Sequence, residues 1–280
     1  MTVHDHAARS VAVPVAETAE PTTRRPGFAV SAAAVPAWAI EALVWTGIVA
    51  LGAAVRWPNL WLIPTFTDET AEALRGMAIY RGEIAPLTNE IAYIGAFWNY
   101  VLAAGFWAFG LSPWLPRLLV YIAGVFTVGA ACWLGRELGG RVGGVVAGLF
   151  MAASSTHALV NSHVGWSHST TPLWATLGFA CLARALYCTP GRPGAWLVAA
   201  GFLLGLAVQT HVTAALLLPG AGLALLLARP RLLPTRWTLL AALAFLAATA
   251  NLLVYNVQTG GGSVRVGQAV LADYTGDEEG

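Results

Sequence analysis

The sequence predicts an all-α fold: a polytopic transmembrane bundle of about seven helices, with juxtamembrane helices in its first external loop. The mean hydropathy of the chain is +0.65, and 57% of its 280 residues are hydrophobic while only 10% are charged. Soluble domains are far more polar than this. The apolar residues also gather into segments close to the ~20 residues that a helix needs to cross a bilayer. Composition and segment length therefore indicate the same fold class.

Seven apolar segments are the candidate spans. The run 195–227 is long enough for two short spans, and the polar triplet Gln209-Thr210-His211 in its middle is the natural place for a turn. Residues 93–110 are ambiguous because they are apolar but rich in aromatic residues, which favour the membrane interface. The five remaining candidates are single runs at 38–55, 115–134, 142–159, 172–187 and 239–255.

The distribution of arginines decides whether 93–110 crosses the membrane. The chain has 15 arginines and no lysine. If the N-terminus is cytoplasmic and 93–110 lies flat in an external loop, ten arginines fall inside and five outside, as the positive-inside rule requires. If 93–110 spans, every later loop changes side, and the inner arginines that move outside include Arg136, Arg141, Arg229, Arg231 and Arg236. We therefore expect seven spans in the cell membrane, with 93–110 in the external loop. Labelling of cysteines placed at positions 138 and 190 would test this topology.

The rest of the chain divides around these spans. Residues 1–36 are polar, rich in Ala, Thr and Pro, and predicted to be a disordered cytoplasmic tail. Residues 37–256 form the membrane domain, which includes the external loop 57–114, and 257–280 form an external acidic tail. No basic stripe indicates nucleic-acid binding, so no nucleic-acid partner is expected. The cysteines lack metal-ligand spacing and are expected to be buried apolar residues. They are Cys132, Cys181 and Cys188.

Two adjacent acids, Asp68 and Glu69, follow the first span at the external surface. Charged residues are scarce in this chain, so this pair is a candidate catalytic site. A structural role is the alternative, because Thr67 can cap a helix and acids in a first helical turn are stabilised by ~0.3–1 kcal/mol. The sequence leaves both roles open.

Residues 68–82 fit one amphipathic helix that Gly82 ends as a C-terminal cap. Helical spacing places Asp68, Glu72 and Arg75 on one face, and Leu74, Met77 and Ala78 on another that can pack on the membrane or on neighbouring helices. Asp68 could act as a base, and the aromatic surface of 93–110 could receive a lipid tail or stack on a sugar. The candidates for holding a phosphate are Arg75, Arg81 and Arg117.

A second external stretch, residues 157–171, is rich in histidine. His163 and His168 in it, and His211 in the turn between two later spans, are candidate contacts for a donor phosphate. The alternative for each is an ordinary polar group whose hydrogen bonds are satisfied within the fold. These stretches, the first loop and the tail from Asn256 onward are all predicted to lie on one side of the membrane.

The order of these features resembles the integral-membrane glycosyltransferases of the GT-C type, which include protein O-mannosyltransferases and the lipid A aminoarabinose transferase of the family 39 kind. The resemblance covers roughly residues 37–260. It is carried by the acidic pair after the first span, by Leu115-Pro116-Arg117-Leu118-Leu119, and by Gly135-Arg136-Glu137-Leu138-Gly139. The acidic pair is its most specific part.

The resemblance implies transfer of a sugar from a polyprenyl-phosphate donor to a hydroxyl of a lipid, polysaccharide or protein, with inversion, on the outer face of the cell membrane. Asp68 would be the catalytic residue, with Glu69 beside it. No residue is assigned as a metal ligand. A divalent cation, Mg²⁺ or Mn²⁺, is compatible with this chemistry but not required by it.

Two departures keep other functions open. The 157–171 loop has no acidic residue, whereas the corresponding loop of relatives often has one. The chain also stops earlier than relatives do, so it can be a fragment, a truncated gene product or a short variant, and then a non-catalytic part of a larger enzyme. A lipid or solute transporter, or a flippase, is a further alternative. It is disfavoured because such proteins carry ionisable residues inside their spans, and these spans have almost none.

Overall fold

The computed structural model describes residues 36–62, 64–65, 67–188 and 193–275. It divides the chain into two units, Met1–Pro36 and Ala37–Gly280, and the predicted N-terminal tail lies outside the described residues except for Pro36. Within the described residues the second unit is built of helices, and its β-structure is one isolated bridge between Thr88 and Gly95. The predicted all-α fold is confirmed.

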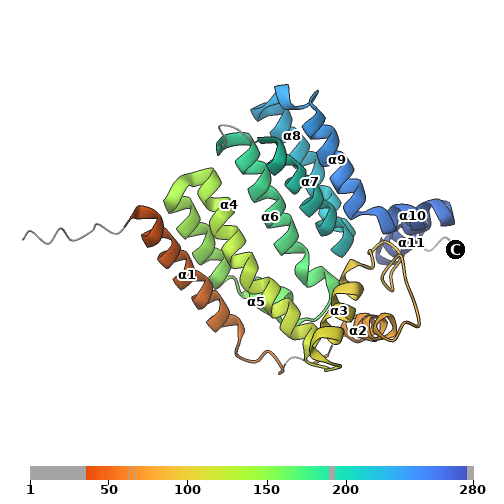
Figure 1. Ribbon diagram of the computed structural model, residues 1–280. Helices are drawn as coiled ribbons and strands as arrows, with labels where there is room; N and C mark the ends of the chain where they lie inside the picture. The colour runs from red at the N-terminus through yellow and green to blue at the C-terminus, as the bar shows by residue number, and fades with distance from the viewer. Residues whose placement is uncertain (1–35, 63, 66, 189–192, 276–280) are drawn as a thin grey trace, which may run out of the picture. The chain divides into compact units, whose positions relative to one another are not determined.

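The helices fall into two groups (Figure 1). One group runs side by side through the length of the bundle: α1 (Ala37–Arg56), α4 (Leu115–Ala153), α5 (Ser155–His163), α6 (Thr171–Ala183), α7 (Pro193–Thr210), α8 (Leu218–Ala228) and α9 (Arg236–Ala248). The other group gathers at one end: α2 (Thr67–Tyr80), α3 (Phe97–Phe109), α10 (Ala250–Thr259) and α11 (Gly262–Thr275). Short 3₁₀ and π turns link them: η1 (Ser167–Thr170), η2 (Arg184–Cys188), η3 (Val212–Leu217) and η4 (Pro230–Leu232).

The long helix α4 is a hairpin of two arms. Gly139 and Gly140 between the arms have non-helical backbone angles, with φ +65° and ψ −158° at Gly140. The arms approach so closely that a Cβ at Gly135 would collide with the carbonyl oxygen of Gly143. Small residues permit such an approach between helices in a membrane. The two arms correspond to the predicted spans 115–134 and 142–159, the second of which continues into α5 after a bend at Ser154.

Three described helices are long and apolar enough to cross a membrane, and a fourth candidate is the bent pair of α9 and α10. The long helices are Ala37–Arg56, Leu115–Ala153 and Pro193–Thr210. The predicted number of seven spans therefore stays a prediction. Helix α3, which contains most of the ambiguous segment 93–110, has 13 residues. That is well short of the ~20 needed to cross, and α3 packs against α2 instead.

The predicted span 239–255 is not one straight helix. The axes of α9 and α10 differ by 67° at Thr249. The Thr249 hydroxyl donates a hydrogen bond to the carbonyl oxygen of Phe245, four residues earlier, at 3.0 Å, and this type of bond often bends helices. Gln209 of α7 donates to the carbonyl oxygen of Ala248 at 2.7 Å. The broken end is thus satisfied by a side chain from a neighbouring helix.

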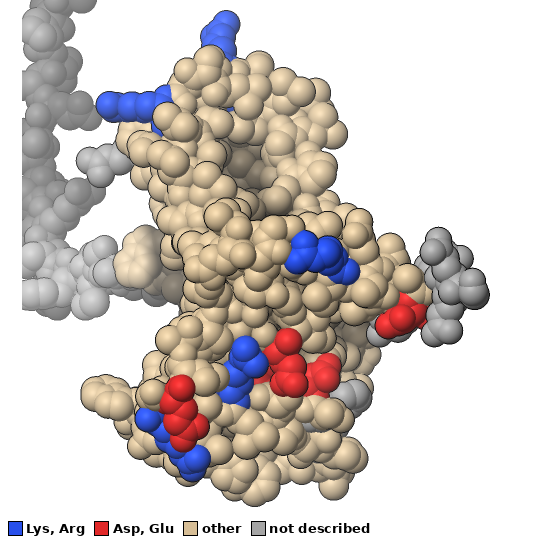
Figure 2. Space-filling model, turned by 90° about the vertical axis from the view of Figure 1, so that its right-hand side faces the viewer, with Lys and Arg blue, Asp and Glu red and all other residues tan. Residues whose placement is uncertain are grey.

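Charged side chains lie toward the two ends of the bundle. In Figure 2 they occupy the top of the visible face and the region from its middle downward, with an uncharged band between the two. At the end that carries the α4 turn, Glu41 of α1 pairs with Arg136 and Arg141. At the opposite end the buried Arg56 of α1 donates to the carbonyl oxygens of Met151 and Ala152, at 2.7 and 3.1 Å. An uncharged band of this kind is what a bilayer core requires.

Candidate active site

Helix α2 presents the acidic pair to two different surroundings. Successive residues of a helix lie 100° apart around its axis, so Asp68 and Glu69 point in different directions. Asp68 is exposed, whereas Glu69 is 4% exposed. The helix ends as predicted: Gly82 has a φ of +74°, and Glu83 donates its backbone N–H to the carbonyl oxygen of Ala78 at 2.9 Å, the hydrogen bond that defines a Schellman cap.

Glu69 forms a buried, two-pronged ion pair with Arg117 at the start of α4. The Nε of Arg117 lies 2.7 Å from Oε1 of Glu69, and its Nη2 lies 2.9 Å from Oε2. Arg117 also donates to the backbone oxygens of Leu60 and Pro64, at 3.3 Å each. This bidentate geometry is the strong form of such a pair. It fastens α2 and the preceding loop to α4.

Asp68 faces a polar pocket of about 330 Å³. Its carboxylate makes no hydrogen bond or ion pair within the described part of the chain. The pocket is built where four separate stretches of the chain meet: the start of α2, the loop before α3, the η1 turn, and His211 just before η3. The side chains with polar or titratable groups that line it include Asp68, Glu72, Asn89, Glu90, Ser167, His168 and His211.

Glu72 lies one helical turn after Asp68 and closes the floor of this polar pocket. Its side chain accepts hydrogen bonds from the Asn89 amide at 2.5 Å, the Ser167 backbone N–H at 2.6 Å and the Ser167 hydroxyl at 2.8 Å. The residue is only 5% exposed. Burial raises the pKa of Glu72 to about 7, with a smaller contribution from the nearby charge of Asp68, against the opposing effect of the hydrogen bonds.

His168 and His211 stack face to face on one wall of the polar pocket. Their ring centroids are 4.0 Å apart with an interplanar angle of 12°. Burial lowers the pKa of both rings, and the pKa of His211 falls to about 4 because His168 adds to the effect. Both are therefore neutral near pH 7. Nδ1 of His211 accepts the backbone N–H of Thr213, so the ring proton of His211 lies on Nε2.

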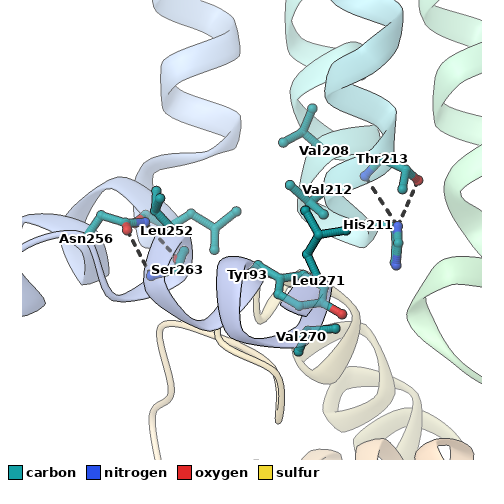
Figure 3. Close-up of a pocket in the computed structure, with 12 residues that line it drawn as sticks. Tyr93, Val208, His211, Val212, Thr213, Leu252, Asn256, Ser263, Val270 and Leu271 are labelled. Atoms are coloured by element: carbon teal, nitrogen blue, oxygen red, sulfur yellow. Dashed lines mark hydrogen bonds between the residues drawn. The ribbon is translucent and has the colours of Figure 1, made fainter. Parts of the chain in front are cut away.

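An apolar groove of about 500 Å³ adjoins the polar pocket. The two cavities share Tyr93 and His211 as lining residues. Figure 3 shows the groove between the end of α7 and the α10–α11 pair, with Tyr93 and Leu271 at its centre. Its other apolar walls come from Val208, Val212, Leu252, Val264 and Val270.

Hydrogen bonds at three places join the segments at this end of the bundle. Ser263 at the start of α11 donates its hydroxyl to the carbonyl oxygen of Ala92 at 2.6 Å. Gly95 donates its N–H to the carbonyl oxygen of Gln209 at 2.9 Å. Ser167 is held by Glu72, as described above. The external stretches predicted to share one side of the membrane thus meet at one end of the structure.

Residues 95–255 match the family described as dolichyl-phosphate-mannose-protein mannosyltransferase. The match covers more than half of the chain. The chain belongs to this family. It is therefore a membrane glycosyltransferase of the GT-C type, as the sequence motifs predicted. No curated protein and no solved structure matches the chain.

The part that matches the mannosyltransferase family includes the η1 and η3 turns with His168 and His211 and begins after α2. The acidic pair therefore lies outside the matched residues. The pocket nevertheless joins both parts, since Asp68 and Glu72 of α2 face Ser167 and His168 across it. Its position at the end of the bundle is where a transferase can meet a donor that is embedded in the membrane.

The other predicted phosphate contacts of this mannosyltransferase-family chain lie away from the pocket. Arg81 is exposed and lies 3.8 Å from Glu83. His163 is buried, with Nδ1 2.5 Å from the Ala158 carbonyl oxygen and Nε2 3.2 Å from that of Pro58. Arg75 is partly buried on α2 and Arg117 is paired with Glu69. Of the six predicted residues, the structure brings only His168 and His211 to the pocket with Asp68.

Glu72, Asn89, Glu90 and Ser167 are polar pocket residues that had no predicted role. For Glu72 a sequence signal was available, because helical spacing placed it on the same helix face as Asp68. No sequence pattern indicated Asn89 or Ser167, because the tertiary fold brings both to the pocket, where they contact Glu72. Among the described residues no three His, Cys, Asp or Glu side chains come together as a metal site, and the use of a divalent cation stays a prediction.

Proposed function

We propose that this protein transfers a sugar, with inversion, from a polyprenyl-phosphate donor to a hydroxyl acceptor at the end of the bundle that carries α2. The observation that supports this most strongly is the pairing of two cavities. A polar pocket with an available carboxylate, Asp68, shares a wall with an apolar groove. A lipid-linked sugar has a polar head and a long apolar tail in the same arrangement.

The phosphate of the donor would lie at the junction of the two cavities. His211 belongs to both, and its Nε2–H can donate a hydrogen bond to a phosphate oxygen. A phosphate beside the stacked rings would favour their protonated forms, which would stabilise the departing charge. A divalent cation would add to this charge, and activity with and without a chelator will show whether one is used.

Asp68 would act as the general base. It would accept the proton of the acceptor hydroxyl while that oxygen attacks the anomeric carbon, and the bond from that carbon to the phosphate oxygen would break, releasing polyprenyl phosphate. Attack from the side opposite to the phosphate inverts the anomeric centre. A carboxylate in position for such a transfer typically contributes 10²–10⁴-fold to the rate.

The family description favours mannose as the sugar, and the acceptor is a lipid, a polysaccharide or a protein. The active end is proposed to face the outside of the plasma membrane. The experiment incubates purified, membrane-inserted protein with a panel of labelled polyprenyl-phosphate hexoses and follows loss of label from the lipid. We expect turnover with one donor and stereochemical inversion in the product.

The decisive variant in this assay is Asp68→Asn, which keeps the shape of the side chain and removes the base. We expect its turnover to fall at least 100-fold. Glu83→Gln is the matched control, because Glu83 is an exposed acid of the same loop outside the pocket, and its turnover should equal that of the wild type. Unchanged turnover of Asp68→Asn in correctly inserted protein would exclude Asp68 from the mechanism.

A further inference from the structure

The carboxylate of Glu72 is held in place by several hydrogen bonds at once. Three donors from two other segments converge on its carboxylate, and each bond is between 2.5 and 2.8 Å. Asn89 is itself fixed, because its Oδ1 accepts the backbone N–H of Glu90 at 2.8 Å. A carboxylate held by this many partners keeps one orientation, which is the property of a preorganised binding group.

The hydrogen-bonding capacity of this carboxylate is not exhausted. A carboxylate offers about four acceptor positions. Oε1 of Glu72 receives Asn89 and the Ser167 hydroxyl, and Oε2 receives the Ser167 N–H, so within the described residues Oε2 keeps one acceptor position without a donor. Glu72 lines the polar pocket. A ligand in the pocket can supply the missing donor.

The ligand chemistry follows from the pocket itself. A carboxylate position that lacks a donor calls for an O–H or N–H group, and the pocket has about 330 Å³, at the small end of the ~300–1,000 Å³ typical of ligand sites. Asp68, one turn away on the same face, is the proposed base beside the anomeric carbon. A sugar whose anomeric carbon lies beside Asp68 would present another part of its ring to Glu72.

We propose that Glu72 accepts a hydrogen bond from one hydroxyl of the transferred sugar and thereby determines which sugar the enzyme uses. This inference rests on the function proposed above and identifies the residue that selects the sugar. A site that is built to hydrogen-bond a substrate hydroxyl strongly rejects the analogue without it, because the buried acceptor is then left without its partner.

The experiment uses the polyprenyl-phosphate hexose that supports turnover, together with its monodeoxy analogues, each lacking one ring hydroxyl. For each analogue the ratio of kcat/KM between parent and deoxy donor is measured in the wild type and in Glu72→Gln. In the wild type we expect one hydroxyl whose removal costs at least 100-fold. In Glu72→Gln this one ratio should fall below about 10-fold, while the ratios at the other hydroxyls stay unchanged.

This comparison isolates the contact, because a general loss of rate cancels from each ratio. Glu83→Gln is the matched control and should keep every wild-type ratio. Glu72→Asp, which withdraws the carboxylate by one methylene, is the second variant and should reduce the same ratio if Glu72→Gln does not fold. If every ratio stays at its wild-type value in the folded variants, Glu72 is structural and the inference is wrong. If the wild type uses no donor of the panel, the proposed function fails instead.

Discussion

At the residue scale, two neighbouring acids have opposite surroundings. The sequence presented Asp68 and Glu69 as a unit, but Asp68 lies in the pocket and Glu69 in an ion pair with Arg117, 48 residues away in the chain. The partner of Glu69 could not be derived from the motif, because it depends on how α2 lies against α4. Arg117, predicted to hold a phosphate, is paired with Glu69 in the structure, and its phosphate-binding role stays a prediction.

Replacing Arg117 by Met tests which role it has. Glu69 would remain buried without its partner, and removing one side of a buried ion pair typically costs ~3–5 kcal/mol. We expect a clearly lower thermal midpoint in detergent and an unchanged KM for the lipid-linked donor. The double variant Glu69→Gln/Arg117→Met should recover much of the lost stability.

Arg81→Met is the control for this prediction, because Arg81 is exposed and lies 3.8 Å from Glu83, where an ion pair contributes ~0–1 kcal/mol. Its thermal midpoint should barely change. A strongly raised KM in Arg117→Met, with an unchanged midpoint, would support the phosphate-binding role predicted for Arg117.

The histidines show the same limit of sequence analysis. His163 and His168 belong to one predicted external stretch. The chain leaves α5 at Val164 with an extended backbone, φ −102° and ψ 118°, and this change of direction sends His163 into the interior and His168 to the pocket. Both side chains are imidazoles. Only the path of the backbone determines that His163 is buried in the fold and that His168 lines the pocket.

At the element scale, the hairpin of α4 follows from the sequence, whereas the bend after α9 does not. Two apolar runs separated by a glycine pair between arginines predict two helices with a turn. Thr249 lies inside one apolar run, and the carbonyl group freed at its bend is satisfied by Gln209 of another helix. Hydropathy reports the length of an apolar segment and does not report whether its axis is straight.

Gly135→Ala tests how closely the two arms of α4 must approach. The added methyl group would meet the backbone of Gly143, which cannot move aside as a flexible side chain can, so we expect the thermal midpoint to fall. Overpacking of this kind typically costs ~1–3 kcal/mol.

Gly129→Ala is the matched control for the hairpin. It lies on the same helix, and its Cβ would meet only a Val49 methyl group at 3.6 Å, an ordinary contact. Since alanine favours the helix over glycine by ~1 kcal/mol, this variant should be equal to or more stable than the wild type. Equal midpoints for the two variants would show that the arms lie farther apart than described.

At the scale of the whole bundle, the separation of polar ends was predictable and the pocket was not. Arginine counting placed the 57–114 loop, the 157–171 stretch and the turn at His211 on one side, and the contacts between Glu72 and Ser167 and between Gly95 and Gln209 join these parts at one end. Which side chains meet within that end depends on packing between helices far apart in the sequence.

The last prediction concerns which end faces outward, because the proposed donor chemistry requires the pocket on the non-cytoplasmic side. In a chain whose native cysteines are replaced, Glu83→Cys beside the pocket end and Leu138→Cys at the α4 turn report the two ends. Both positions are exposed, whereas position 190 lies outside the described residues. An impermeant maleimide should label Cys at 83 in intact cells and Cys at 138 only after permeabilisation. Labelling at position 138 in intact cells would show that the α4 turn faces outward. Asp68 would then lie on the cytoplasmic side, where a lipid-linked donor of the outer leaflet cannot reach it.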